Sequence, residues 1–253
     1  METIVRRSFY LAAIGLLAAS GCFAGSYEES YRKSVVRYRQ ESEFQGLHKE
    51  SRTLTGGRLR LRVPKLFDDE DSDGTKEWSK PPILEDLGRN RIGYRCPKAL
   101  KNENVRATLT VYAVTDDEIS FDGIKTLILE AVRKEPAFAA VDWQQVETQT
   151  DDDGKPAWSM MKLEGQQPFD REVANNPEEK SSEGETQIWV SSSPESKVSA
   201  VLVWRIPQEL AAEVLLHELA PLVARKVELL PEPKPAPAAA APDPAQEAAP
   251  AAK

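Results

Sequence analysis

The chain has 253 residues and a formal net charge of −8, with 33 Lys and Arg against 41 Asp and Glu. General nucleic-acid binding requires a positive surface, so this acidic balance predicts no nucleic-acid partner. Two cysteines exclude a disulfide framework and a thiolate zinc cluster. The length is sufficient for one domain with a hydrophobic core and additional terminal segments.

The first residues have the layout of a secretory signal. Arg6 and Arg7 form a positive start, Phe9 to Ala19 is an apolar stretch, and small residues then lead to Cys22. The apolar stretch is too short to cross about 30 Å of hydrocarbon as a retained helix. We therefore predict a signal peptide over residues 1–21.

The end of this segment, Ala19 to Cys22 (ASGC), resembles the lipobox of bacterial lipoproteins. The resemblance implies cleavage before Cys22, a diacylglyceryl group on its sulfur, and an acyl group such as palmitate on the new amine. Such a lipoprotein is held in the cell membrane or outer membrane and faces the periplasm or the exterior. Two alternatives stay open: an ordinary signal peptide with an incidental Cys22, and a Cys22–Cys96 disulfide. Arg6-Arg7 also resembles a twin-arginine export signal.

Residues 22–57 are predicted to be a lipid-anchored tether that contains a helix. Four apolar or aromatic residues recur at helical spacing on one face, and four basic residues lie beside them. They are Tyr27, Tyr31, Val35 and Tyr38, and Arg32, Lys33, Arg37 and Arg39. Such a helix can lie on an anionic membrane surface. The alternative is that the stripe packs on the domain and the basic residues face solvent.

A strand with one basic face is predicted directly after Gly57. Leu59, Leu61 and Val63 alternate with Arg58, Arg60 and Arg62 until Pro64 ends the run. The arginine row is a candidate anion-binding site for a head group or a polymer. The alternative is a row that faces solvent or pairs with carboxylates on the next strand.

The stretch from Asp68 to Lys80 is predicted to be an acidic loop. Asp69, Asp71 and Asp73 alternate and Gly74 follows, as in loops that wrap calcium in oxygen ligands. Lys80 occupies the position of the bidentate Glu, which disfavours an EF-hand. A looser calcium site on the three aspartates stays open, and calcium is the only cofactor that the sequence suggests. The alternative is a solvated acidic loop.

The remaining elements follow from hydrophobic periodicity and turn residues. Strands are predicted at Ile92–Cys96, Val105–Val114, Val141–Thr148, Ala157–Leu163, Gln187–Ser191 and Val198–Arg205. One helix carries the apolar stripe Ile124, Leu127, Ile128, Ala131 and Val132, with Asp122 as its expected cap. A second runs from Pro207 to about Leu229 and should kink or break at Pro221. Gly165–Glu185 is predicted to be an exposed polar loop, and the Pro- and Ala-rich residues 231–253 a disordered tail.

The order of strands, helix, hairpins and final helix resembles the PsbP-like superfamily. The residues that carry the resemblance are the opening Leu61–Pro64 (LRVP), the closing Val201–Pro207 (VLVWRIP) and the helix that follows. The resemblance implies an α+β domain over residues 58–230, with a central antiparallel sheet between helices in an α/β/α sandwich. Members of the superfamily are typically non-catalytic binding or accessory proteins, and several are lipid-anchored.

Catalytic motifs are sparse in this sequence. The two histidines, His48 and His217, do not form a zinc-binding pair, and no Gly-x-Ser-x-Gly elbow is present. Trp158, Trp189 and Trp204 fall in predicted strands, where a core role is expected in place of sugar stacking.

We therefore predict a lipid-anchored envelope protein that binds or supports a partner without catalysis. Its expected partners are the membrane and either envelope proteins or a cell-wall polymer. Two alternatives remain: a calcium- or anion-binding module, and a hydrolase with a site scattered in the sequence.

Overall fold

The computed structural model describes residues 31, 34, 44–54, 58–72, 76, 80, 81, 84, 87, 90–96, 105–146, 157–169, 181–193 and 195–231. The chain divides into two compact units, Met1–Leu47 and His48–Lys253. The predicted signal peptide, Cys22, most of the tether and residues 232–253 lie outside the described residues, as does Asp73. No helix among the described residues is long and apolar enough to span a bilayer.

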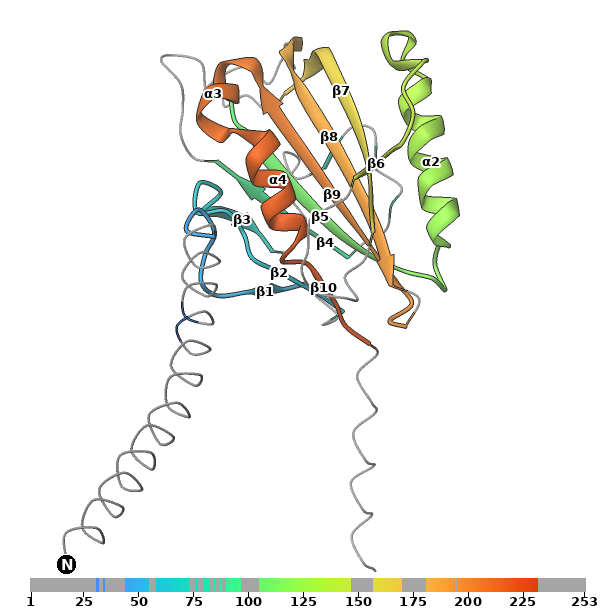
Figure 1. Cartoon of the computed structure of the whole chain (residues 1–253). Helices are drawn as coiled ribbons and strands as arrows, with labels where there is room; N and C mark the ends of the chain where they lie inside the picture. The colour runs from blue at the N-terminus through green and yellow to red at the C-terminus, as the bar shows by residue number, and fades with distance from the viewer. Residues whose placement is uncertain are drawn as a thin grey trace, which may run out of the picture. The chain divides into compact units, whose positions relative to one another are not determined.

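A seven-stranded antiparallel sheet forms the centre of the second unit, in the order β3-β4-β5-β9-β8-β7-β6 (Figure 1). The strands are β3 (Asp69–Asp71), β4 (Arg91–Arg95), β5 (Thr108–Thr115), β6 (Gln144–Val146), β7 (Trp158–Pro168), β8 (Ser181–Ser193) and β9 (Val198–Pro207). A three-stranded sheet in the order β1-β2-β10 is built from Arg52–Thr53, Leu59–Leu61 and Glu228–Leu229. The predicted antiparallel α+β architecture is therefore confirmed.

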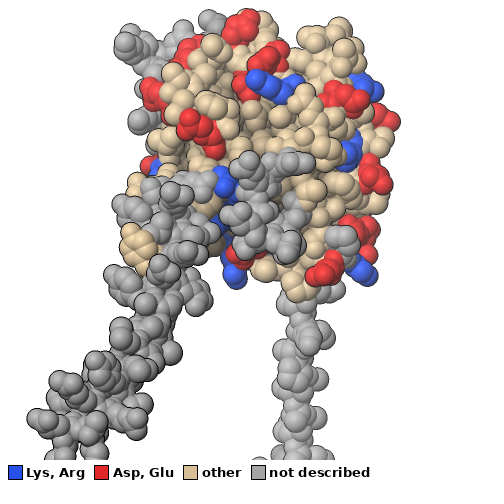
Figure 2. Space-filling view, in the orientation of Figure 1, with Lys and Arg blue, Asp and Glu red and all other residues tan. Residues whose placement is uncertain are grey.

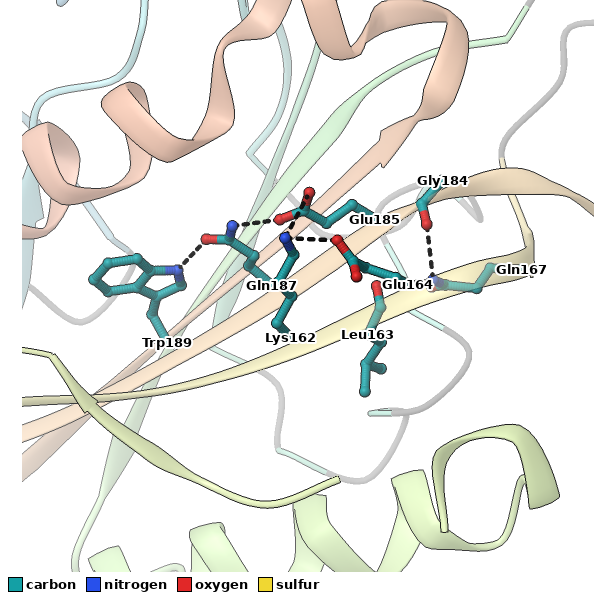
Figure 3. Close-up of polar contacts among 8 residues, drawn as sticks. All are labelled: Lys162, Leu163, Glu164, Gln167, Gly184, Glu185, Gln187 and Trp189. Carbon is teal, nitrogen blue, oxygen red and sulfur yellow. Dashed lines mark hydrogen bonds and ion pairs between the residues drawn. The ribbon is translucent and has the colours of Figure 1, made fainter. Parts of the chain in front are cut away.

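Helices cover both faces of the large sheet. They are α2 (Phe121–Arg133), α3 (Ala211–Val214) and α4 (Leu216–Ala224), with short 3₁₀ turns η2 (Pro136–Phe138) and η3 (Gln208–Leu210). Figures 1 and 3 show α2 on one side of the sheet and α3 and α4 on the other. The sheet between them has two buried faces, which explains why every residue of β9 is buried.

Alternation along the strands assigns side chains to the two faces. On the α2 side, Met161, Ile188 and Val203 lie opposite one another on β7, β8 and β9. They pack with Ile124 and Ile128 of α2 in one fully buried cluster. The predicted apolar stripe of this helix is therefore its core-facing side.

Helix α2 begins at Phe121, two residues before the start that a cap at Asp122 would give. Ser120, not Asp122, is the N-cap residue, and its hydroxyl accepts a hydrogen bond from the Gly123 N–H at 3.2 Å. Asp122 lies in the first turn, where its negative charge interacts favourably with the helix dipole. The prediction of Asp122 as the cap is wrong because a serine two residues before it already satisfies the free N–H.

The acidic stretch after Asp68 is partly a strand, so the prediction of a loop is wrong for Asp69–Asp71. These residues form β3, which pairs with β4 through Asp69↔Arg95 and Asp71↔Gly93. The opposite charges of Asp69 and Arg95 stabilise this pair across the sheet edge.

The predicted loop Gly165–Glu185 is also largely strand where the structure describes it. β7 continues to Pro168, β8 begins at Ser181, and Gly165 pairs with Gly184 in unbroken register. Gly165 has a φ of 120°, a conformation that glycine adopts without strain. The polar residues that suggested a loop bond to one another within the sheet.

The final helical segment breaks at Leu215 and not at the predicted Pro221. Leu215 has a left-handed backbone (φ 46°, ψ 55°) between α3 and α4, and Pro221 lies inside α4. In so short a helix the missing N–H of Pro221 removes at most one intrahelical bond. The helix also ends before the predicted Leu229, because Glu228–Leu229 is strand β10, paired with β2.

Candidate functional site

The predicted arginine row lies on β2 and beside it. Leu59, Leu61 and Val63 are buried as predicted. Arg60 is exposed and forms an ion pair of 3.4 Å with Glu228, its register partner on β10. Arg58 donates to the carbonyl oxygen of Ser196. Arg60 therefore pairs with a carboxylate on the neighbouring strand, as the alternative prediction stated. Arg62, the last arginine of the row, is half-buried.

The candidate calcium ligands Asp69 and Asp71 lie on β3. Asp69 accepts hydrogen bonds from Arg95, the Nε at 2.9 Å, and lies 3.7 Å from the ammonium of Lys76. Asp71 is buried and accepts from the backbone N–H of Lys76 at 3.0 Å. Within the described residues, no three His, Cys, Asp or Glu side chains gather closely enough to hold a metal. A calcium ion at Asp69 would have to compete with a guanidinium already bound there.

Both histidines are exposed at the surface. His48 is exposed, and the side chain of His217 is 74% exposed with its Nε2 3.6 Å from Glu218. Cys96 is buried, as expected of a small apolar residue. Trp158, Trp189 and Trp204 are all buried, which confirms the predicted core role.

Sequence patterns did not reveal a concave site among the described residues, a cavity of about 590 Å³ between α2, η2 and the sheet. Its apolar wall consists of Pro81, Leu84, Leu127, Ala131, Ala137, Phe138, Pro168, Ile188 and Val203. Its polar wall consists of Gln166, Gln167, Ser181, Thr186 and Arg205, and Glu130, Lys134 and Glu135 line the helical side. The cavity is therefore amphipathic.

The polar wall is ordered by hydrogen bonds between β7 and β8. The Thr186 hydroxyl donates to the Gln167 side-chain oxygen at 2.6 Å. The Gln167 amide, drawn in Figure 3, donates to the carbonyls of Leu163 at 3.1 Å and Gly184 at 3.4 Å. Gln167 and Thr186 are buried, so these hydrogen bonds replace the ones that their side chains make with water in the unfolded chain. The network gives this end of the cavity a fixed arrangement of polar atoms.

One cation lies at the polar end. Arg205 is only 8% exposed, is the register partner of Thr186, and donates to the carbonyl oxygen of Pro168. Its guanidinium also lies 5.6 Å from the centre of the Phe169 ring. A backbone carbonyl and an aromatic face, both favourable partners for a guanidinium, thus position the Arg205 side chain.

The opposite face of β7 and β8 carries a second polar chain, which does not line the cavity (Figure 3). The indole N–H of Trp189 donates to Gln187 at 2.9 Å, and the Gln187 amide donates to Glu185. Lys162 forms ion pairs with Glu164 at 2.6 Å and Glu185 at 3.5 Å. The hydrogen bond to Glu164 is the main cause of the raised pKa of Lys162.

The surface charges show no concentrated basic region on the face seen in Figure 2. Among the described residues drawn there, carboxylates and basic side chains are interspersed. That face therefore lacks the positive footprint typical of a nucleic-acid interface.

Tyr94, on β4, carries a buried hydroxyl that makes no hydrogen bond with any described residue. Burial, and secondarily the negative charge of Glu70, raise the pKa of Tyr94 above its usual range. An unfolded tyrosine ionises near pH 10. The folded state therefore loses stability as the pH rises above about 10, because only the unfolded chain releases this proton.

We predict that Tyr94→Phe leaves stability at pH 8 unchanged or raises it by up to about 1 kcal/mol, because it removes an unpaired buried hydroxyl. The variant should also lose less stability than the wild type between pH 8 and pH 10.5. Urea unfolding followed by circular dichroism at both pH values measures the difference. Tyr31→Phe is the control, since Tyr31 is 62% exposed. Equal alkaline losses in the wild type and Tyr94→Phe would contradict the prediction.

The described part of the chain thus defines an α+β protein with an antiparallel sheet, helices on both faces and an amphipathic cavity beneath one helix. No protein-family profile and no curated protein sequence matches the chain.

Solved structures show distant similarity. A single-residue variant of the protein Mog1 aligns at 12% identity and a TM-score of 0.40 over 72% of this chain and 96% of its own. The Ran-binding protein Mog1p of Saccharomyces cerevisiae aligns at 13% identity and a TM-score of 0.40 over 73% and 97%. The cyanobacterial PsbP of Synechocystis aligns at 8% identity and a TM-score of 0.35 over 71% and 91%.

Proposed function

We propose that this protein is a lipid-anchored binding or accessory protein of the cell envelope, held by Cys22, with a PsbP-like domain that acts without catalysis. The sequence Ala19 to Cys22 supports the anchor. The residues between Cys22 and strand β1 (Arg52–Thr53) then serve as the tether, and residues 231–253 as a C-terminal tail. The partner is an envelope protein or a cell-wall polymer at the membrane surface.

The observation that carries the binding role is the cavity under α2. Its volume of about 590 Å³ lies within the usual range of ligand sites, about 300–1,000 Å³. Apolar walls with a few ordered polar atoms are also typical of such sites, because the apolar part supplies affinity and the polar part supplies orientation.

The chemistry of the cavity wall favours binding over catalysis. A hydrolytic nucleophile requires a base within hydrogen-bond reach. The Thr186 hydroxyl donates instead to the amide of Gln167. The described histidines do not line the cavity, and its carboxylates, Glu130 and Glu135, belong to exposed residues.

The anchor is tested by Cys22→Ala in the natural host. We expect this variant to lose incorporation of labelled palmitate and to leave the membrane fraction, because two or more acyl chains are needed for stable attachment. Cys96→Ala is the matched control and should keep both the label and the membrane location. If Cys22→Ala carries as much palmitate as the wild type, the lipobox assignment is wrong.

A further inference from the structure

The long walls of the cavity are apolar and come from the helical layer and from the sheet. Leu127 and Ala131 lie on α2, Phe138 lies on η2, and Ile188 and Val203 come from β8 and β9. An aliphatic chain between these walls is removed from water on both sides. Each buried methylene then improves binding by about fourfold.

The hydrogen-bond donors at the buried polar end of the cavity are already used within the protein. The Thr186 hydroxyl has one hydrogen and donates it to the side-chain oxygen of Gln167. The Gln167 amide has two hydrogens and donates to two backbone carbonyls, those of Leu163 and Gly184 (Figure 3). Arg205 is engaged by more than one group of the protein. This end therefore does not offer a donor to a ligand.

Oxygen lone pairs are what this end does offer. A hydroxyl oxygen and an amide oxygen can each accept two hydrogen bonds. Among the described residues, none donates to the Thr186 oxygen, and the Gln167 oxygen accepts only from Thr186. Both side chains are buried and line the cavity. The polar end therefore favours a ligand that donates a hydrogen bond over a ligand that only accepts one.

The charged side chains that line the cavity favour a neutral ligand. Glu130 and Glu135 are balanced by Lys134 and Arg205, so the formal charge of the lining is zero. A ligand ammonium at the buried end would lie near the positive charge of Arg205, which is the register partner of Thr186. A ligand carboxylate there would meet acceptor oxygens. A hydroxyl donates a hydrogen bond without the cost of burying an unpaired charge.

We propose that the cavity binds a neutral aliphatic alcohol, with its hydroxyl donating to the oxygen of Thr186 or Gln167 and its chain between α2 and the strands β8 and β9. The inference rests on the proposed binding role of the cavity and specifies its ligand class. The hydroxyl belongs to a simple long-chain alcohol or to the glyceryl group of a neutral lipid, which share this chemistry.

The probe is octanol, titrated calorimetrically into the full mature chain that carries Cys22→Ala, so that no detergent is present. We expect a single site, with hexanol about tenfold weaker because it lacks two methylenes. Octylamine and octanoate should each bind at least tenfold more weakly than octanol, because each of them buries a charge. Octanoate or octylamine binding as tightly as octanol would overturn the assignment of a neutral head group.

Monooctanoylglycerol, titrated in the same way, distinguishes the two sources of the hydroxyl. If it binds more tightly than octanol, the ligand is a neutral glycerolipid. If it binds more weakly, the ligand is a simple alcohol.

A first set of variants tests the polar end. The double variant Thr186→Val, Gln167→Leu removes both acceptor oxygens and should weaken octanol about tenfold, because the buried hydroxyl loses its partner. Methyl heptyl ether, an isomer of octanol that cannot donate, should bind this variant within twofold of the wild type. Thr186→Ser keeps the hydroxyl and should bind octanol as the wild type does. Equal losses for octanol and the ether in a folded double variant would overturn the assignment of the hydroxyl.

A second set of variants locates the chain and decides the matter if the double variant does not fold. Ala137→Trp places a large side chain on the cavity wall and should weaken octanol at least tenfold. Ala139→Trp, an exposed neighbour that does not line the cavity, is the matched control and should bind within twofold of the wild type. Octanol binding that survives Ala137→Trp would place the site elsewhere and overturn the proposal, as would the absence of measurable binding.

The anchor is read independently of octanol, through palmitate labelling and membrane fractionation of Cys22→Ala and Cys96→Ala. An anchored protein that does not bind octanol therefore overturns this inference alone and leaves the proposed anchored function standing.

Discussion

Replacement of Gly184 by alanine is expected to lower the free energy of unfolding by about 3 kcal/mol. A Cβ atom at this position would overlap the Phe169 ring and lie 2.7 Å from the carbonyl oxygen of Ile206. Neither neighbour can move freely, because Phe169 is buried and Ile206 belongs to the central strand β9. The strands must therefore separate locally or the ring must leave its position.

Thermal and urea unfolding measure this effect, and a loss of about 3 kcal/mol corresponds to a fall in Tm of about 10 °C for a domain of this size. Gly46→Ala is the matched control, since no atom lies within 4 Å of the Cβ position there. In a Phe169→Ala background the cost of Gly184→Ala should be smaller, with the contact to Ile206 remaining. If the losses in unfolding free energy of Gly184→Ala and Phe169→Ala are strictly additive, the Phe169 ring is not what opposes a Cβ atom at position 184.

Replacement of Trp204 by alanine is expected to cost about 4 kcal/mol, the usual range for a fully buried aromatic residue. Trp204 is 0% exposed on β9, and its ring meets Phe67 edge to face at a centroid distance of 5.6 Å. Its indole N–H makes no hydrogen bond with a described residue, in contrast to that of Trp189. Packing, and not hydrogen bonding, is therefore the contribution that the alanine variant loses.

Two further variants separate these contributions. Trp204→Phe should cost less than half as much as Trp204→Ala, because it keeps an aromatic contact with Phe67 and removes an unpaired buried donor. Trp143→Ala should also cost less than half as much, since Trp143 is half-buried near Lys125. Urea unfolding gives the three values. A cost of Trp204→Phe equal to that of Trp204→Ala would contradict the packing argument.

Elements with a regular local pattern could be predicted from the sequence. Leu59, Leu61 and Val63 alternate with arginines, and the alternation correctly assigned the buried face of β2. The helical spacing of Ile124, Ile128 and Val132 likewise identified the core side of α2. In both cases the hydrophobic period is set by backbone geometry, which neighbouring residues alone determine.

The sequence predicted loops at polar segments whose hydrogen-bond and ion-pair partners lie on other strands. Gln167 and Ser182 suggested a loop, but they are buried in the β7–β8 pair, where Gln167 accepts a hydrogen bond from Thr186. Asp69 became part of a strand because Arg95, far along the chain, pairs with it. Such partners are invisible to a local pattern, since polar residues lose their preference for solvent only when a partner is present.

The predicted signal peptide over residues 1–21 and the lipobox-like Cys22 are linear motifs, so their prediction depends on the sequence alone and on no fold. The strand and helix periods, and hence the α+β class, were also determined locally. Only the tertiary structure brought Leu127, Gln167 and Arg205, from three separate elements, to one cavity. The physical reason is that a cavity forms from the packing of a helix against a sheet, and that packing depends on contacts between residues far apart in the chain.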